Sequence, residues 1–166
     1  MTDRGGEGKQ NGPLRLHAVE GADLDVVSAA LQGAVVLRRD MNFAASRRQF
    51  AFVCNRFRWE QGEIAGASGG SRIRAGVSFN DISAVRAQGV SKATPDTVME
   101  LLSVRAEQTD PPAATITLSF AGGGTLELVA GCIDVLVDDM GRPWYTPHRP
   151  AHDDDSQDAK DSQDPR

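Results

Sequence analysis

From Ala34 onward, the chain consists mainly of short segments in which apolar and polar residues alternate. A period of two places every second side chain on the same face of a β-strand, so this pattern predicts strands rather than helices. The clearest pair spans Thr115 to Phe120 and Thr125 to Val129, which three consecutive glycines connect. Because glycine adopts positive φ readily, these segments are predicted to form a β-hairpin. They indicate a fold rich in antiparallel strands.

The segment Arg47 to Glu60, RRQFAFVCNRFRWE, holds four of the nine aromatic residues of the chain. Its first apolar residues, up to Cys54, share one face of a strand, whereas Phe57 and Trp59 fall on the opposite face. A shift of one residue turns every later side chain to the other face. A single regular strand therefore cannot bury all of these apolar groups on one side.

We predict a β-bulge near Asn55 and Arg56, or a strand that is long enough to change sheets. Either arrangement would expose Arg56 and Arg58 together. If the two strands are neighbours, this pair of arginines would lie next to Arg72 and Arg74.

Other segments also have the composition of strands and turns. Val35 to Leu37 and Met41 to Ala44 are predicted as two strands on either side of a charged turn at 38–40, and Ser46 to Arg48 as a turn. Arg72 to Phe79 alternates cleanly and, with Ile82 to Ala87, is predicted to form a hairpin. Leu14 to Val19 alternates as a half-buried strand does.

The clearest helix is predicted over Ala22 to Gln32. Its apolar positions are three and four residues apart, which places them on one face of a helix: Leu24, Val27 and Leu31, widened by Val26 and Ala30. Gly33 follows as a C-terminal cap.

Two further helices are expected. Thr94-Pro95-Asp96 resembles a helix start and predicts a short helical turn that leads into a strand near Leu101 to Glu107, with a helix that continues through Met99 and Leu102 as the alternative. Cys132 to Met140 has apolar residues at helical spacing and predicts a closing helix, although its β-branched residues leave a strand as the alternative.

The predicted fold class is α+β and β-rich. We expect a largely antiparallel, bent sheet, a sandwich or a small roll, with one early and one C-terminal helix. A roll like that of pleckstrin-homology domains is one candidate, from which the early helix departs.

One globular domain is expected over residues 14–146, between a disordered N-terminus at 1–13 and a disordered acidic tail at 147–166. Residues 61–71 contain four glycines and predict a mobile loop. No apolar run is long enough to cross a membrane, and the first residues lack the apolar core of a secretory signal. These features predict a cytoplasmic protein that does not bind membranes.

Little in the sequence indicates catalysis or a cofactor. The three histidines do not accompany a nucleophile, and the two glycine-rich loops lack the Gly-Lys-Ser/Thr ending of a phosphate-binding loop. Cys54 and Cys132 stand alone and are expected to be reduced core thiols. Asp134, Asp138 and Asp139 are expected on or beside the closing helix, as a solvated face rather than a metal site. We therefore expect neither cofactor nor metal, and no catalytic residue can be named.

The arginines are the main functional lead. Residues 38–86 contain nine arginines and four acidic residues, a net charge of +5 in a chain whose total is −5. Arginine favours bidentate contacts with carboxylates and phosphates. The candidate binding residues in this segment are Arg47, Arg48, Arg56, Arg58, Arg72 and Arg74. Pairing of these arginines with acidic residues of the same fold is the alternative.

Four motifs, RFRWE, RAGVSFNDISAVRAQGV, TITLSFAGGGTLEL and CIDVLVDDMGRPW, resemble those of a bacterial family catalogued as a domain of unknown function, DUF2948. The resemblance covers about residues 14–150 and leaves out the acidic tail. It implies no activity, cofactor or catalytic residue.

Three functions are compatible with these features. The first is a non-enzymatic binding or adaptor module that holds an anionic partner, an acidic protein surface or nucleic acid, on its arginines. The second is an enzyme or small-molecule binder with a pocket between sheet and helix. The third is a structural subunit that associates through a sheet edge, and the sequence does not set the oligomeric state.

Overall fold

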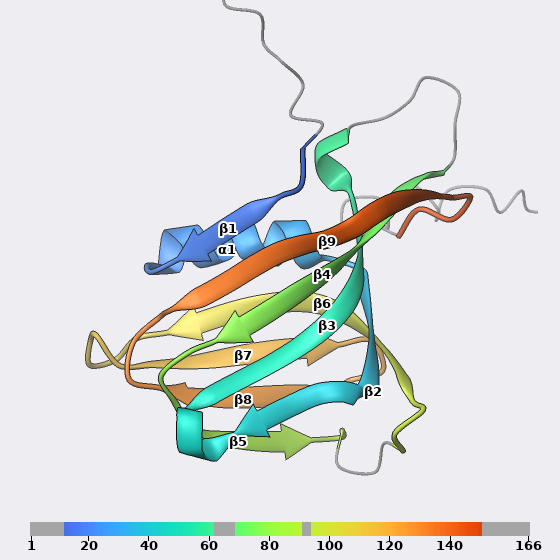
Figure 1. Ribbon diagram of the computed structural model, residues 1–166. Helices are drawn as coiled ribbons and strands as arrows, with labels where there is room; N and C mark the ends of the chain where they lie inside the picture. Colours follow the sequence, from blue (N-terminus) through green and yellow to red (C-terminus); the bar gives the residue numbers. More distant parts are fainter. Residues whose placement is uncertain (1–11, 62–68, 91–93, 151–166) are drawn as a thin grey trace, which may run out of the picture.

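A computed structural model describes residues 12–61, 69–90 and 94–150 of the chain (Figure 1). These residues form one antiparallel sheet of nine strands, with the spatial order β1-β9-β4-β3-β2-β6-β7-β8-β5. The strands are β1 (Arg15–Ala18), β2 (Ala34–Ala44), β3 (Gln49–Phe57), β4 (Gly70–Phe79), β5 (Ile82–Gln88), β6 (Val98–Glu107), β7 (Ala114–Phe120), β8 (Thr125–Ala130) and β9 (Val135–Thr146). One helix, α1 (Gly21–Leu31), and two 3₁₀ turns, η1 (Ala45–Arg47) and η2 (Trp59–Gln61), complete the described part. The α+β class and the β-rich antiparallel sheet are confirmed.

The sheet changes direction within β2. Residues 34–37 of β2 pair with β6, whereas residues 41–44 pair with β3 alone. Val36 lies opposite Cys54 and Met41 opposite Phe52, so the intervening residues of β2 have a single residue of β3 opposite them. Extra residues on one strand form a bulge and bend it. The turn predicted at 38–40 is therefore a bulge inside one strand.

The bulge predicted near Asn55 is wrong, because β3 keeps one register with β4 from Phe50 to Phe57. A strand that changes layers does exist, but it is β2. No bulge is needed in β3, because Arg56, and not an apolar residue, continues the inward face of this strand after Cys54.

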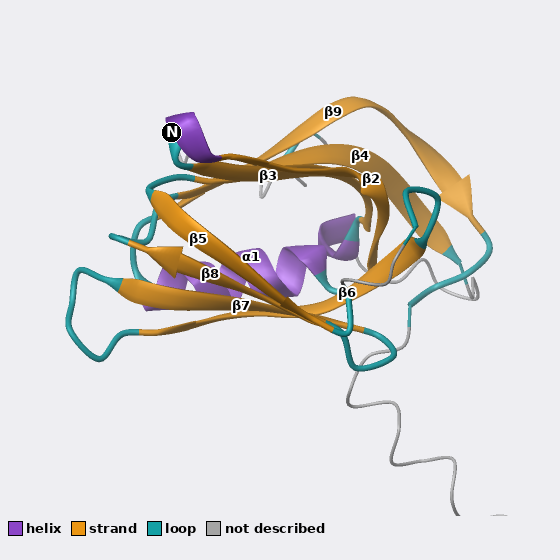
Figure 2. Cartoon of the chain, turned by 90° about the horizontal axis from the view of Figure 1, so that it is seen from below, coloured by secondary structure: helices purple, strands orange, loops and turns teal. Residues whose placement is uncertain are grey.

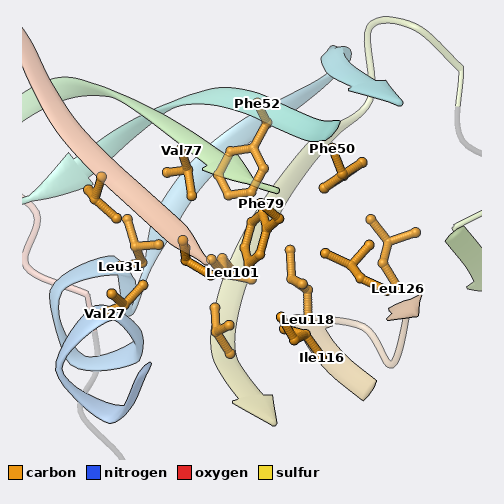
Figure 3. Packing of buried hydrophobic residues seen from close by; sticks show 14 of the residues in the cluster. Val27, Leu31, Phe50, Phe52, Val77, Phe79, Leu101, Ile116, Leu118 and Leu126 are labelled. Carbon is orange, nitrogen blue, oxygen red and sulfur yellow. The ribbon is translucent and has the colours of Figure 1, made fainter. Parts of the chain in front are cut away.

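Two layers of strands enclose the core (Figure 2). The layer with β3, β4 and β9 lies across from the layer with β6, β7 and β8, and α1 covers one end of the space between them, next to β1 and β6 (Figure 1). Phe50, Phe52 and Phe79 point into this space, with ring centroids 6.0 to 6.2 Å apart (Figure 3). Leu118 and Leu126 from the opposite layer complete the packing.

The helix forms where it was predicted. The carboxylate of Asp23 accepts a hydrogen bond from the Glu20 N–H at 3.2 Å and caps the first turn. Leu24, Val27 and Leu31 are buried against the sheet. Gly33 has a φ of +77°, the conformation that glycine adopts after a helix. Val26 does not belong to the buried stripe, because it is 55% exposed.

The predicted hairpin of β4 and β5 is wrong, although a short turn connects the two strands. β4 pairs with β3 and β9, whereas β5 pairs with β8 at the far edge of the sheet. Asp81 in the connection has a φ of +57°. Local alternation identified both strands, but it carries no information on which strand each one pairs with. The hairpin of β7 and β8 is confirmed.

The predicted closing helix is also wrong, because residues 135–146 form β9. Val135 and Val137 are fully buried, and Leu136 between them is exposed, as a strand requires. The described chain therefore lacks the final helix of a pleckstrin-homology-like roll. Likewise, residues 94–97 form a turn rather than a helix, and β6 begins at Val98.

Several expectations fall outside the described residues. These are most of the predicted disordered N-terminus, most of the loop at 61–71, and the tail from 151 onward. In the described segments, no helix is both long and apolar enough to span a bilayer.

Candidate functional site

The six candidate arginines lie in three different places and do not form one face. Arg47 and Arg48 belong to the connection between β2 and β3, Arg56 lies near the end of β3, and Arg58 follows directly after that strand. Arg72 and Arg74 are on β4, on the side that faces away from the core.

Arg56 is completely buried and is surrounded by acceptors. Its Nε and Nη2 donate to the two carboxylate oxygens of Asp139 at 2.7 and 2.6 Å. Its Nη2 and Nη1 donate to the two oxygens of Glu60 at 2.6 and 3.0 Å, and Nη1 also donates to the Phe57 carbonyl at 3.3 Å. A guanidinium has five N–H groups, and each has an acceptor here. We call Arg56, Asp139 and Glu60 the interior cluster.

The interior cluster stabilises the fold and has no donor left for a ligand. Burial works against the charge of Arg56, but its hydrogen bonds to Asp139 and Glu60 outweigh this and raise its pKa above the ordinary value. Asp139 also accepts a hydrogen bond from the Leu14 N–H at 2.7 Å, which ties the start of the domain to β9. Internal pairing is therefore the correct interpretation for Arg56.

Arg58 is also buried, with 9% of its surface exposed. Its backbone N–H donates to the Ser71 carbonyl at 2.8 Å, and its Nη1 lies 3.4 Å from Ser71 Oγ. Its Nε has no hydrogen-bond partner among the described residues. The prediction that Arg56 and Arg58 turn outward together is wrong, because the bulge that would turn them does not form.

The outward face of β3, β4 and β9 carries two rows of side chains that the strand register aligns. Phe57, Arg72 and Trp144 lie opposite one another in one row. Asn55, Arg74 and Met140 form the next row. We call Arg72, Arg74, Met140 and Trp144 the outer strip.

The cations of the outer strip have no acidic hydrogen-bond partner in the described part of the chain. Arg72 donates to the carbonyls of Gly33 and Asn55 at 3.3 and 3.0 Å and lies 5.9 Å from the centre of the Phe57 ring. Burial lowers the pKa of Arg72, and the more distant Glu100 only partly offsets this. Arg74 is exposed. The strip therefore presents positive charge beside Trp144 and Met140, which are 41% and 39% exposed.

A shallow hollow of about 380 Å³ adjoins the outer strip. Small residues form its floor, namely Ala51, Gly76 and Ser78, because they leave the sheet surface without bulky side chains. Leu136 and Met140 line one side, so Met140 belongs to both the hollow and the strip. Two carboxylates also line the hollow, those of Asp40 and Asp138, and Asp138 is paired with Arg15 at 2.8 Å.

The aromatic residues of the Arg47 to Glu60 segment are not an open stacking surface. Phe57 is 4% exposed and its ring centre lies 4.6 Å from that of Trp59. Arg149 lies over both rings, 6.0 and 5.4 Å from their centres, and Trp59 Nε1 donates to the Gln32 carbonyl at 2.9 Å. Residues 147–150, expected to begin the disordered tail, thus contact the domain.

The arginines of the β2–β3 connection have a structural partner. Arg48 donates from Nε and Nη2 to one oxygen of Asp81 at 3.0 and 2.8 Å, and its carbonyl accepts from the Ile82 N–H at 2.8 Å. We call this set of contacts the latch, because it joins the β2–β3 turn to the start of β5. Arg47 is exposed.

The remaining reactive groups are used within the fold. Burial raises the pKa of the Cys54 thiol to about 12, so it stays protonated at neutral pH. The aspartates expected on one helix face lie on or next to β9, where Asp134 contacts His17 at 2.7 Å and Asp138 and Asp139 pair with Arg15 and Arg56. Over the described residues, no three potential metal ligands come together.

A family model described as Protein of unknown function (DUF2948) matches residues 14–152. The chain belongs to the DUF2948 family. Neither a curated protein nor a solved structure gives a significant match.

The DUF2948 match spans α1 and all nine strands, so the interior cluster, the outer strip and the hollow all belong to the family domain. Trp144, Met140 and Leu136 were missed in the sequence because their segment was assigned to a helix and its end. The available signal was the alternation of Val135 and Val137 with Leu136, which is typical of a strand.

Proposed function

We propose that this DUF2948 domain is a non-enzymatic binding module that holds an acidic, partly apolar protein segment on the outer strip and the hollow. The observation that carries the proposal is the position of Arg72 and Arg74, which lack acidic hydrogen-bond partners in the described part and adjoin exposed Trp144 and Met140. Of the six arginines predicted as binding residues, these two are the ones that the proposal keeps.

The composition of this surface resembles that of protein interfaces. Arginine, tryptophan and methionine are enriched at interfaces, and tryptophan and arginine often carry much of the binding energy. Nucleic acid, the other predicted partner, is held by several exposed cations together with free aromatic faces. Phe57 and Trp59 lie under Arg149, so the surface is less suited to stacking bases.

The partner would place an apolar side chain in the hollow and carboxylates on Arg72 and Arg74. Bidentate contacts between arginine and carboxylate give both affinity and orientation. We place this binding in the cytoplasm of a bacterial cell, in keeping with two cysteines that form no disulfide.

The two other functions have less support. An enzyme or small-molecule binder would need a pocket between sheet and helix, but the hollow between α1 and β6 has a volume of only about 190 Å³. It is lined by Asp25 and Arg105, whose Oδ1 and Nη1 atoms lie 4.0 Å apart. Association through a sheet edge would use β1 or β5, the outermost strands of the sheet.

Selection of peptides from a random displayed library tests the proposal. We expect the wild-type domain to enrich peptides that combine Asp or Glu with a large apolar residue. Arg74→Glu should abolish capture of these peptides, and Trp144→Ala should weaken it. Arg105→Glu is the matched control, because it makes the same charge change on β6, away from the strip.

A labelled oligothymidylate, measured by fluorescence anisotropy, separates the two predicted partners. The proposal fails if no acidic peptide is enriched, or if Arg74→Glu and Arg105→Glu capture the enriched peptides equally well. It also fails if only the oligonucleotide binds in an Arg74-dependent way, since the surface would then recognise nucleic acid.

A further inference from the structure

We infer a second binding site, separate from the outer strip, that takes a small amphiphile with an apolar body and a single negative charge. The site lies between the second half of β2 and the edge strand β5. It does not depend on the function proposed above, because its cation is Arg38 rather than Arg72 or Arg74 and it opens into the core rather than onto the outward face; Asn42 alone lines both the cavity and the hollow.

Among the described residues, the connection after β2 is hydrogen-bonded to β5 at one end of the two strands. The latch joins the turn after β2 to Ile82 at the start of β5. Beyond it, residues 41–44 of β2 pair with β3 alone, and β5 pairs with β8 alone, in the described part of the sheet. No ladder hydrogen bond therefore joins residues 41–44 of β2 to β5 among the residues that the structure describes, and the gap between the two strands reaches the core.

The gap contains a cavity of about 280 Å³ with mainly apolar walls. Phe43 and Phe50 line it from one layer, and Val85 and Leu126 from the other. Phe50 and Leu126 belong to the core itself (Figure 3). Val85 faces inward because it lies opposite the buried Leu128 of β8.

The volume sets the size of the ligand. An apolar cavity of about 150 Å³ in another protein stays dry and binds benzene. This cavity is close to twice that size, which suits an unbranched chain of roughly eight to ten carbons or a fused pair of aromatic rings. A bilayer lipid with two long chains would not fit.

The cavity mouth determines the charge of the ligand. Arg38 lines the cavity and is exposed, and its guanidinium makes no ion pair or hydrogen bond with any described side chain. Its neighbour Arg39 pairs with Asp96 at 3.1 Å instead. The Arg38 N–H donates to the Thr97 carbonyl at 3.0 Å, which holds its backbone in place. Asn42 adds an amide at the same cavity, so a carboxylate head would find both a cation and a hydrogen-bond donor.

Titration calorimetry with decanoate tests this site. We expect saturable binding of one decanoate per chain, with weaker binding of hexanoate, hexadecanoate and decanol. Decyltrimethylammonium, which has the same chain and a positive head, should not bind. Arg38→Gln should weaken decanoate binding about tenfold, the loss expected for one charge-assisted hydrogen bond.

Arg39→Gln is the matched control, since it removes the same charge one residue away and should leave binding unchanged. Val85→Phe fills the cavity and should abolish decanoate binding. Ala87→Leu narrows the mouth of the cavity and should weaken decanoate binding. Because Ala87 is exposed, this second variant keeps the test valid even if Val85→Phe does not fold. The inference is overturned if decanoate shows no saturable binding, if decyltrimethylammonium binds equally well, or if Ala87→Leu and Arg38→Gln both bind as the wild type does.

Discussion

At the scale of single residues, the position of Arg56 decides how its segment is interpreted. Regular alternation from Phe52 and Cys54 places Arg56 on the inward face of β3, but its sequence neighbours do not show which groups would pair with a buried charge there. Asp139, whose carboxylate accepts two of its hydrogen bonds, lies 83 residues further along the chain. A buried charge of this kind is tolerated only when its partners are all present.

Loss of the Arg56 side chain should therefore destabilise the domain strongly. Arg56→Ala leaves Asp139 buried without its cation, and we expect the free energy of unfolding to fall by about 3–5 kcal/mol. Arg74→Ala removes an exposed arginine and should change the free energy of unfolding by less than about 0.5 kcal/mol. Urea unfolding followed by tryptophan fluorescence measures both, and similar values for the two variants would contradict the structural role of Arg56.

Glu60 should make stability depend on acidic pH. Burial alone would raise the pKa of its carboxyl, but the hydrogen bonds from Arg56 lower it below the ordinary value. A carboxyl with a lowered pKa in the folded state stabilises the protein above its unfolded pKa of about 4.3, and this contribution is lost as the pH falls through the folded value.

Glu60→Gln removes this contribution. The difference in unfolding free energy between the wild type and this variant should be constant from pH 7 to about 5.5 and shrink as the pH falls to about 3. Urea unfolding at a series of pH values measures the difference. A difference that does not change with pH would show that Glu60 is not held by Arg56 as a carboxylate.

At the scale of elements, local patterns identified α1 and most strands, but they failed where two periodicities overlap. Residues 133–140 fit a helix through Ile133, Leu136, Val137 and Met140, whereas the alternation of Val135 and Val137 with Leu136 fits a strand, which is β9. Pairing with β1 on one side and β4 on the other buries Val135 and Val137, which decides for the strand. Similarly, the polar residues at 38–40 indicated a turn, but neighbours on both sides hold β2 as one bent strand.

Two substitutions in α1 separate the buried stripe from the exposed side of the helix. Leu31 is fully buried, so Leu31→Ala should lower the free energy of unfolding by about 2–5 kcal/mol through loss of apolar contacts and the cavity left behind. Val26 is 55% exposed, and Val26→Ala should change the free energy of unfolding by less than about 0.5 kcal/mol. Thermal and urea unfolding test both; equal losses would place Val26 in the core, as the sequence alone suggested.

At the scale of the whole molecule, one sheet is bent until its two layers face each other, and the latch joins them at one corner. Strands that pair are often far apart in the sequence, as β1 and β9 are, and as β5 and β8 are. Folds with many such pairs form slowly, because the chain must be ordered before the contacts are gained. The cavity opens on the side beyond the latch, where β5 is held in the sheet by its pairing with β8.

Loosening the latch should increase the mobility of β5 without unfolding the domain. Arg48→Gly keeps the carbonyl that accepts from Ile82 and suits the φ of +50° at this position, but it removes the ion pair with Asp81. Both partners are about half exposed, so the expected loss of stability is under about 1 kcal/mol.

Hydrogen–deuterium exchange measures the effect. The amides of β5 should exchange faster in Arg48→Gly, while those of β3 and β4 should not change. Arg15→Ala, which removes another exposed ion pair at the opposite edge of the sheet, should leave β5 unaffected. Unchanged exchange in β5 of the Arg48 variant would mean that the ion pair does not hold this corner.

The amino-acid sequence was enough to predict which residues of most strands face inward, the position of α1 to within one residue, and an antiparallel, β-rich α+β fold. These properties depend on side-chain periodicity and on capping residues a few positions away. Only the assembled fold established the pairing of β4, β5 and β9, the bend in β2 and the surroundings of each candidate arginine. It brought Asp139 to Arg56, and it placed Arg72 and Arg74 beside Trp144 on the outward face. Those outcomes depend on residues many tens of positions apart, whose contacts exist only once the sheet has assembled.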